Sequence, residues 1–359
     1  MEKRVAYIDI ARGIGILLIV LGHNDLSEYH PFLHKFVYSF HIPLFFFLSG
    51  MFLKPERPFR DLLKRRFDSL LKPFLFIIFA IYLFEAGFGN MTFPVMLGRI
   101  AKSLYANGFY LDWVQLWFIP HLFAVNLFAF AAWHALFKRI PWLWLRLIAL
   151  FGMLALGVAT MKYFMPFSLA SFSERTLNGL PFSLDLALAS GFFFLLGYEV
   201  NRKSPGNFLA SPLVTLGPFG LLIALNLFTD APIDFNTRTY SSLWINTAGA
   251  LLGICMVISL SKFIEDHSAW LTRVFSYLGR ISLVILIFHV PIQEAMGIKF
   301  VRLGVPTDPT IALAFLSGVL FPVLFYEMGI HLNPRLRPWF GFAAEASSHR
   351  EEAKGAKEN

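Results

Sequence analysis

The sequence predicts an all-α polytopic integral membrane protein of about ten transmembrane helices, with both termini in the cytoplasm. Three observations lead to this fold class. Of the 359 residues, 57% are hydrophobic and only 15% are charged, whereas soluble domains carry about a quarter charged residues. Apolar runs long enough to cross a bilayer recur along the chain. Lysine and arginine gather in alternate breaks between these runs, as the positive-inside rule describes.

The apolar runs place the ten spans near residues 8–24, 36–53, 71–88, 114–137, 143–161, 182–200, 209–228, 243–261, 276–294 and 309–331. With the N-terminus inside, the inner segments hold more than twice as many Lys and Arg residues as the outer ones. The net charge of +8 therefore indicates membrane orientation, and we expect no nucleic-acid partner.

Several segments need separate interpretation. The first span is not a convincing signal peptide, because Arg12 interrupts its apolar run and no small-residue cleavage site follows. Pro43 should kink the second span. The connection from Gly89 to Trp113 has an amphipathic middle, expected to lie on the outer surface or to re-enter the membrane. We expect residues 1–342 to form one membrane domain and 343–359 a disordered cytoplasmic tail.

The first span carries the residues with the clearest chemical meaning. Asp9 and Arg12 lie near its start and His23 at its far end. On a helix, Arg12 and His23 fall within roughly 20° of one face and about 16 Å apart along the axis. Ionisable residues in a span are costly and usually functional, although Arg12 also has the plain alternative of pairing with Asp9 at the membrane boundary.

Four histidines fall in the outer half of the membrane on four different spans: His23, His41, His121 and His289. None of them belongs to an H-x-x-x-H or E-x-x-H pair, which metal-binding helices usually contain, so we expect no metal. A polar cavity in which one histidine moves protons is the better interpretation. Packing alone, such as a histidine bonded to a carbonyl freed by a kink, is the alternative for each one.

The densest basic segment follows the second span and reads KPERPFRDLLKRRFDSLLKPF. Topology and attraction to anionic lipid headgroups explain most such clusters. The functional alternative is a site for a polyanionic cytoplasmic ligand such as a nucleotide-bearing cofactor, with Lys64, Arg65, Arg66 and Lys72 as candidate ligands and Arg12 extending the site into the bundle.

Six segments in order along nearly the whole chain resemble the acyltransferase 3 family of integral membrane O-acyltransferases. They read IDIARGIGILLIVLGH, SFHIPLFFFLSGMF, KRRFDSLLKPF, LWFIPHLF, SGFFFLLGYEV and LGRISLVILIFHVPI. The first contains the family's arginine, ten intervening residues and histidine.

The resemblance implies an acyl-CoA donor on the cytoplasmic side and an acceptor outside, with transfer through a site within the bundle. By position, Arg12 and His23 correspond to the family's first motif and Trp117 to the tryptophan of its fourth-span motif. The family's pair of arginines three residues apart is broken here, because Ser69 follows Arg66 at that spacing. The chain is similar to the stand-alone members that have no C-terminal esterase-like domain.

These interpretations predict a multi-pass protein of the bacterial cytoplasmic membrane that acylates a sugar. The expected donor is acetyl-CoA or another acyl-CoA, and the acceptor a hydroxyl of an extracytoplasmic or lipid-linked glycan. His23 and Arg12 would be catalytic, while His41, Trp117, His121 and His289 would line the substrate pocket. A separate envelope protein is a further expected partner. A transporter or flippase of sugars without covalent chemistry is the alternative function, and Ser39, Ser49, Tyr38 and Ser282 are the open choices for an acyl carrier.

Overall fold

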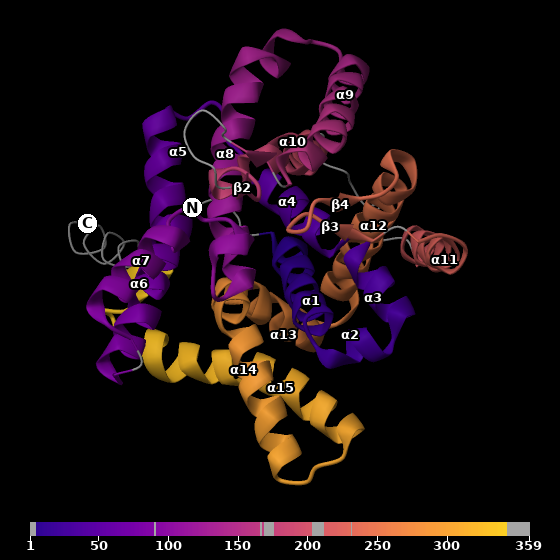
Figure 1. Cartoon of the computed structure of the whole chain (residues 1–359). Coiled ribbons are helices and arrows are strands. Elements are labelled where there is room, and N and C mark those ends of the chain that lie inside the picture. Colours follow the sequence, from indigo (N-terminus) through magenta and orange to yellow (C-terminus); the bar gives the residue numbers. More distant parts are fainter. Residues whose placement is uncertain are drawn as a thin grey trace, which may run out of the picture.

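The computed structural model describes residues 5–89, 91–165, 167–168, 176–202, 212–230 and 232–342 (Figure 1). This part of the chain is a bundle of helices with two short antiparallel hairpins. The α-helices are α1 (Ala6–Gly22), α2 (Asp25–Tyr29), α3 (Pro31–Tyr38), α4 (His41–Gly50), α5 (Phe59–Arg66), α6 (Lys72–Gly87), α7 (Phe93–Ser103), α8 (Phe118–Ala135), α9 (Leu143–Met161), α10 (Ala187–Arg202), α11 (Pro212–Phe228), α12 (Leu243–His267), α13 (Ala269–Arg280), α14 (Ser282–Arg302) and α15 (Thr307–Phe325).

Short elements complete the described chain. Two π-helices are η1 (Phe67–Leu71) and η8 (Tyr326–His331). The 3₁₀-helices are η2 (Gly108–Tyr110), η3 (Val114–Trp117), η4 (Phe137–Arg139), η5 (Lys162–Phe164), η6 (Pro181–Leu186) and η9 (Arg337–Phe340). In the hairpins, β1 (Phe167–Ser168) pairs with β2 (Thr176–Leu177) and β3 (Ile233–Asp234) with β4 (Thr239–Tyr240). The predicted disordered tail, 343–359, lies outside the described residues.

The all-α polytopic membrane fold is confirmed. Eight helices of the described chain are long and apolar enough to cross a membrane, and each corresponds to one of the ten predicted spans. The other two predicted spans are the 17-residue helices α1 and α11. At 1.5 Å per residue such a helix is about 25 Å long, close to the shortest length that spans a bilayer.

Three spans differ in detail from the sequence prediction. The second is broken at Ser39 and Phe40, between α3 and α4, because Pro43 cannot donate a hydrogen bond to the carbonyl of Ser39. The ninth begins at Ser282, after a break at Ile281 that makes α13 a separate helix. The third begins with α5, before the predicted start near residue 71, so the basic segment is helical from Phe59 onward.

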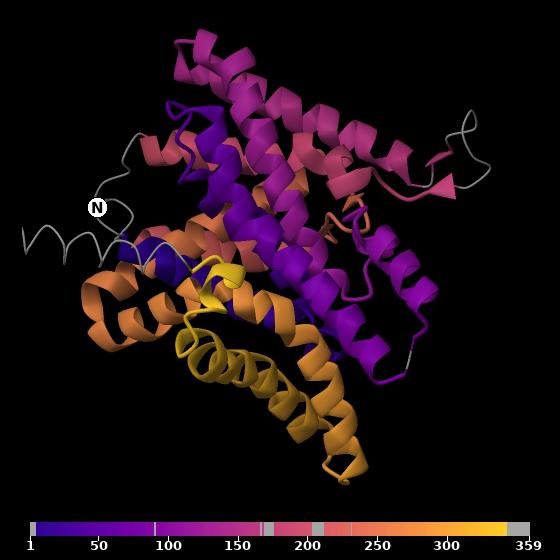
Figure 2. The same cartoon turned by 90° about the vertical axis from the view of Figure 1, so that its left-hand side faces the viewer.

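The connection from Gly89 to Trp113 forms α7, which folds back against α6. The Tyr82 hydroxyl of α6 lies 2.7 Å from the Ser103 hydroxyl of α7. The Arg99 guanidinium also pairs with the Glu85 carboxylate at 3.1 Å. Figure 2 shows α6 and α7 as a hairpin at one edge of the bundle. The segment therefore forms a helix that packs against α6, the span that precedes it.

Helix α1 lies at the centre of the bundle and packs against α4, α12, α13 and α14. Its closest neighbour is α13, where two glycines allow backbone contact. A Cβ atom at Gly13 would lie 2.1 Å from the carbonyl oxygen of Phe275, and one at Gly279 would lie 1.9 Å from the carbonyl oxygen of Asp9. Real Cβ atoms do not approach oxygen so closely, so only glycine fits at either place.

The two ends of the described chain lie on the same face of the bundle. Arg12, near the start of α1, shares a cavity with Arg66. Gly341, near the last described residue, packs against Ser69 of η1. An even number of membrane crossings requires this arrangement, in agreement with the ten predicted spans.

Substituting Gly279 by alanine should destabilise the bundle. The new methyl group would push α13 away from α1, and overpacking of this kind costs about 1–3 kcal/mol. The matched control is Gly297→Ala in α14, where no atom lies within 4 Å of the new Cβ, so its stability should be unchanged or slightly higher. Thermal unfolding of both purified variants in detergent measures the difference, and equal midpoints would contradict the close packing of α1 and α13.

Labelling of single cysteines should place the two faces of the bundle on opposite sides of the membrane. In a Cys255→Ser background, a membrane-impermeant maleimide should label Thr237→Cys, exposed beside β4, in intact cells. Glu56→Cys, exposed in the turn before α5, should react only after permeabilisation. Labelling of Glu56→Cys in intact cells would reverse the predicted orientation.

Candidate functional site

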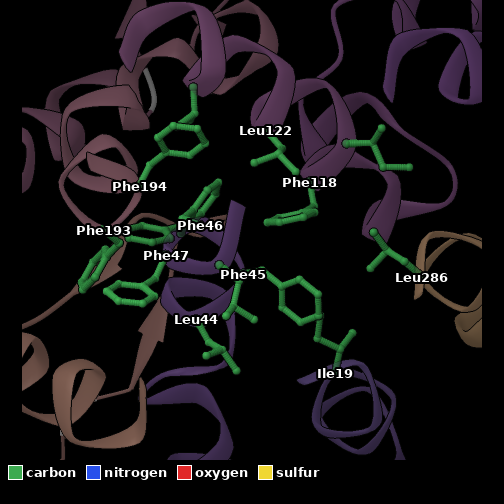
Figure 3. Close-up of a cluster of buried hydrophobic side chains, with 14 of the residues drawn as sticks. Ile19, Leu44, Phe45, Phe46, Phe47, Phe118, Leu122, Phe193, Phe194 and Leu286 are labelled. Carbon is green, nitrogen blue, oxygen red and sulfur yellow. The ribbon is translucent and has the colours of Figure 1, made fainter. Parts of the chain in front are cut away.

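A cavity of about 220 Å³ opens at the end of the bundle where α1 begins, which is called the inner end below. Its lining residues come from five parts of the chain: Arg12, Ile16 and Ile19 of α1, Phe45 and Ser49 of α4, Arg66, Ser69 and Leu70 around η1, Phe118, Ile119 and Leu122 of α8, and Ser282, Leu283 and Leu286 of α14. In Figure 3, Ile19, Phe45, Phe118 and Leu286 converge from four helices on one region.

Two guanidinium groups lie at the inner end of this cavity. The Arg12 Nη1 atom is 3.9 Å from an Asp9 carboxylate oxygen, and the guanidinium carbon stands 4.7 Å from the centre of the Phe52 ring. Arg66 lines the same cavity and is close enough to Arg12 for the two charges to repel. Two neighbouring cations in a partly buried space suit the binding of an anion.

The four basic residues that the sequence indicated as candidate ligands differ in their position relative to the cavity. Arg66 lines the cavity. Lys72 donates to the Asp68 carboxylate at 3.0 Å, while Lys64 and Arg65 are exposed and do not line it. Arg66 is therefore the residue of this segment placed to share a ligand with Arg12, and the roles of Lys64, Arg65 and Lys72 remain predictions.

A local feature of the backbone positions Arg66. Pro73 has no N–H to offer the carbonyl of Ser69, so a regular helix cannot run through this point unchanged. The chain adopts the π-helix η1 instead, and the Lys72 N–H reaches the carbonyl of Phe67, five residues back. This wider turn directly follows Arg66, and its residues Ser69 and Leu70 line the cavity. π-helical turns of this kind often occur at functional sites.

Two histidines lie beyond the cavity, farther along two of the helices that line it. On α1 the lining residues Arg12, Ile16 and Ile19 are followed on the same face by His23. On α14, Leu286 is followed one turn later by His289. The two imidazole rings lie 5.3 Å apart between centroids, with 54° between their planes. His23 is exposed at the end of α1, whereas His289 is fully buried.

His41 joins this outer cluster through the break between α3 and α4. Its Nδ1 atom lies 2.9 Å from the carbonyl oxygen of Val37, and its ring makes an edge contact with Tyr38 at 4.7 Å. The Tyr38 hydroxyl in turn lies 3.5 Å from the carbonyl oxygen of Gly22, beside His23. The predicted pocket residues His41 and His289 are thus on the same side of the bundle as the predicted base.

His121 has a different environment. One ring nitrogen lies 3.0 Å from the carbonyl oxygen of Phe182 and the other 3.0 Å from the Ser190 hydroxyl, and the ring stacks on Trp117. Phe182 has φ 57° and its neighbour Ser183 has φ 51°, both in the left-handed region. His121 therefore holds this strained turn of η6 in place, which accounts for its burial without a substrate. Its place in the pocket, and that of Trp117, stays a prediction.

Two groups of polar contacts were not predicted from the sequence. Asn24 donates to the Gln293 side chain at 2.8 Å, and Gln293 donates to the carbonyl of Val20 at 3.1 Å, so these amides join the outer ends of α1 and α14. Amide side chains within apolar spans are a recognisable signal of such contacts. Farther out, Arg238 and Asp185 form a fully buried ion pair, at 2.9 and 3.1 Å, that ties the turn between β3 and β4 to η6.

The serines considered as acyl carriers also differ in whether they line the cavity. Ser49 and Ser282 line the cavity, whereas the Ser39 hydroxyl donates to the carbonyl of Phe36 at 2.7 Å. Among the described residues, no group of three or more histidine, cysteine or acidic side chains is arranged to hold a metal ion.

Comparison with known proteins gives one match. The sequence model of a family described as an acyltransferase domain matches residues 5–327, nearly the whole described chain. No curated protein and no solved structure matches.

Breaking the ion pair of Arg238 and Asp185 should unfold the outer loops first. Arg238→Gln leaves a buried carboxylate without its partner, which costs about 3–5 kcal/mol. Arg99→Gln is the control, because Arg99 forms an exposed pair with Glu85 that contributes under about 1 kcal/mol. Limited proteolysis and thermal unfolding compare the two variants. An Arg238→Gln protein as resistant as the control would show that the pair does not hold the loops together.

Proposed function

Because the chain belongs to the acyltransferase 3 family and is a multi-pass membrane protein, we propose that it is an O-acyltransferase. In this proposal it moves an acyl group, acetyl in the simplest case, from cytoplasmic acyl-CoA to a hydroxyl of an extracytoplasmic or lipid-linked sugar. Membrane acyltransferase activity follows from the family itself. The donor, the acetyl group, the sugar acceptor and the bacterial cytoplasmic membrane are the proposed refinements.

The observation that supports the proposal best is the distribution of charge along the cavity. Arg12 and Arg66 line the cavity together with apolar side chains, and His23 and His289, which are not among its lining residues, lie farther along α1 and α14. Coenzyme A has phosphates at one end and a thioester at the other, joined by the pantetheine arm. Guanidinium groups bind phosphate well, so the inner end suits the nucleotide part and the apolar walls suit the arm and the acyl chain.

The outer end suits the chemistry of transfer. A sugar hydroxyl is a weak nucleophile at neutral pH and needs a base to remove its proton as it attacks the thioester carbonyl. In the proposed step the hydroxyl oxygen forms a bond to the carbonyl carbon and its proton passes to His23. The carbon–sulfur bond then breaks, and the proton returns to the departing CoA thiolate. The products are the sugar ester and free CoA.

A sugar transporter without covalent chemistry, the alternative interpretation of the sequence, would release no free CoA. A thiol assay with acetyl-CoA, the reconstituted protein and mixed glycan acceptors therefore tests the proposed function directly. Absence of any acetyl-CoA cleavage by the wild-type protein, over acceptors that include lipid-linked sugars, would contradict it. Glycan mass spectrometry of cells with and without the gene would identify both the acyl group and the acceptor.

Substitutions at the two ends of the cavity should give opposite kinetic defects. Arg66→Ala should weaken CoA binding with turnover of bound donor largely retained, because it removes a contact to phosphate. His23→Ala should leave CoA binding intact and lower turnover by about 10² to 10⁴, the range of general-base assistance.

Arg65→Ala is the matched control for Arg66→Ala, since it removes an exposed neighbouring arginine that does not line the cavity. CoA affinity by calorimetry and turnover by thiol release are measured on the same preparations. Equal losses of affinity at Arg65 and Arg66 would mean that the segment acts only through its net charge.

A further inference from the structure

The described structure holds His289 in one tautomer. Its Nδ1 atom lies 3.0 Å from the carbonyl oxygen of Ile285 and 2.9 Å from that of Leu286. Carbonyl oxygens only accept hydrogen bonds, so Nδ1 carries the proton. In the neutral ring Nε2 therefore presents a lone pair, and it can only accept.

This lone pair is buried and has no partner among the described residues. His289 itself is 0% exposed. Buried polar atoms are nearly always hydrogen-bonded, because burial without a partner costs free energy. An unpartnered acceptor one turn beyond Leu286, a residue that lines the cavity, therefore points to a donor that reaches it during the working cycle of the protein.

His23 is in ring contact with His289 and can supply that donor. Two imidazoles joined by a straight N–H···N hydrogen bond of ordinary length have ring centroids about 5 Å apart, and the rings of His23 and His289 are 5.3 Å apart. The pair is already at this separation, but the ring planes are 54° apart and no hydrogen bond reaches His289 Nε2. The bond that we infer therefore requires the exposed His23 side chain to rotate.

The backbone keeps this separation constant while the ring rotates. The N–H of His23 is bonded to the carbonyl of Ile19 at 3.1 Å. One turn beyond His289, Gln293 bonds to the carbonyl of Val20, three residues before His23, and to the side chain of Asn24, the residue after it. The amide contacts therefore fix the outer end of α1 against α14, and the freedom that remains is in the His23 side chain.

We propose that His289 is a positioning residue for His23: its Nε2 accepts a hydrogen bond from one ring nitrogen of His23 and so keeps the other nitrogen unprotonated and aimed at the acceptor hydroxyl. When His23 takes the proton of the hydroxyl, both of its nitrogens carry hydrogen, and the bond to His289 stabilises the positive charge. The proton then leaves with the CoA thiolate and His289 stays neutral throughout. This role rests on the proposed acyl transfer.

His41 is the competing partner and fits less well. Its Nδ1 is also held by a carbonyl four residues back, but the ring contact that the structure shows for it is with Tyr38. His289 combines a fixed tautomer, an unpartnered acceptor and a ring contact with His23.

The test compares His289→Gln with His289→Leu. Glutamine places an amide oxygen near the position of Nε2 and can accept the same hydrogen bond, whereas leucine fills the space without an acceptor. His289→Leu should lower kcat by about 10²-fold, the lower end of general-base assistance, with CoA affinity unchanged, and His289→Gln should recover part of the loss. His267→Leu is the matched control, because the His267 Nδ1 is also bonded to a carbonyl four residues back, at 2.8 Å, in an exposed place away from the cavity.

A double-mutant cycle separates positioning from independent catalysis. If His289 acts through His23, then His289→Leu should cost nothing further in a His23→Ala background. Additive losses would show that His289 is a base in its own right and would overturn the proposal. A second pattern would also overturn the proposal: His289→Leu loses CoA affinity and His289→Gln does not recover turnover. This pattern is expected of a purely structural residue.

A second measurement does not depend on acyl transfer. Diethyl pyrocarbonate modifies unprotonated imidazole nitrogens, and peptide mass spectrometry reads the rate at His23. That rate should be several-fold slower in His289→Leu than in the wild type and His289→Gln, with the rate at His267 unchanged. Equal rates at His23 in all three proteins would overturn the pairing even if the wild type transfers acyl groups. The predicted difference in a protein that cleaves no acyl-CoA would support the pairing while contradicting the proposed function.

Discussion

The backbone contact between α1 and α13 is the constraint on which the arrangement of the site depends. Gly13 and Gly279 let the two helices approach until main-chain atoms touch, and such a contact leaves α1 little freedom to rotate or slide. This contact fixes the rotation of α1, so that Arg12, Ile16 and Ile19 line the cavity. The packing against α13 therefore fixes the positions of Arg12 near one end of α1 and of His23 at the other.

The two ends of α1 have different electrostatic surroundings. At the inner end, Arg12 and Arg66 repel one another, and the bundle tolerates this partly buried repulsion because other contacts hold the helices in place. At the outer end the groups are imidazoles, tyrosine and amides, and the Asp234 carboxylate is close enough to His23 and Tyr38 to interact with them electrostatically. Under the proposed function, the phosphates of the donor would meet the arginines at the inner end, and the acceptor hydroxyl would meet the histidines at the outer end.

The sequence was sufficient for the spans and for much of α1, because hydropathy and helical periodicity are local properties. It also gave the break before Pro43, since a proline acts on the residue four positions earlier. It could not select Arg66 from its basic neighbours, because that choice depends on the π-helix η1 and on where α1 lies. Nor could it pair His23 with His289, which come from the first and ninth predicted spans and meet only in the folded bundle. The role of His121 in holding η6 was hidden for the same reason.

Three of the histidines that the structure describes share one local arrangement and differ in what surrounds it. His41, His267 and His289 each have Nδ1 within 3.0 Å of the carbonyl oxygen four residues back, an arrangement that a helix supplies without any tertiary contact. It fixes the tautomer and turns Nε2 into an acceptor. At His267 that nitrogen belongs to an exposed ring stacked on Phe263, where water is always available. At His289 it is buried beside a second imidazole, where water is not. The chemistry of the position therefore comes from the neighbouring ring and the exclusion of solvent, and the helix contributes only the orientation.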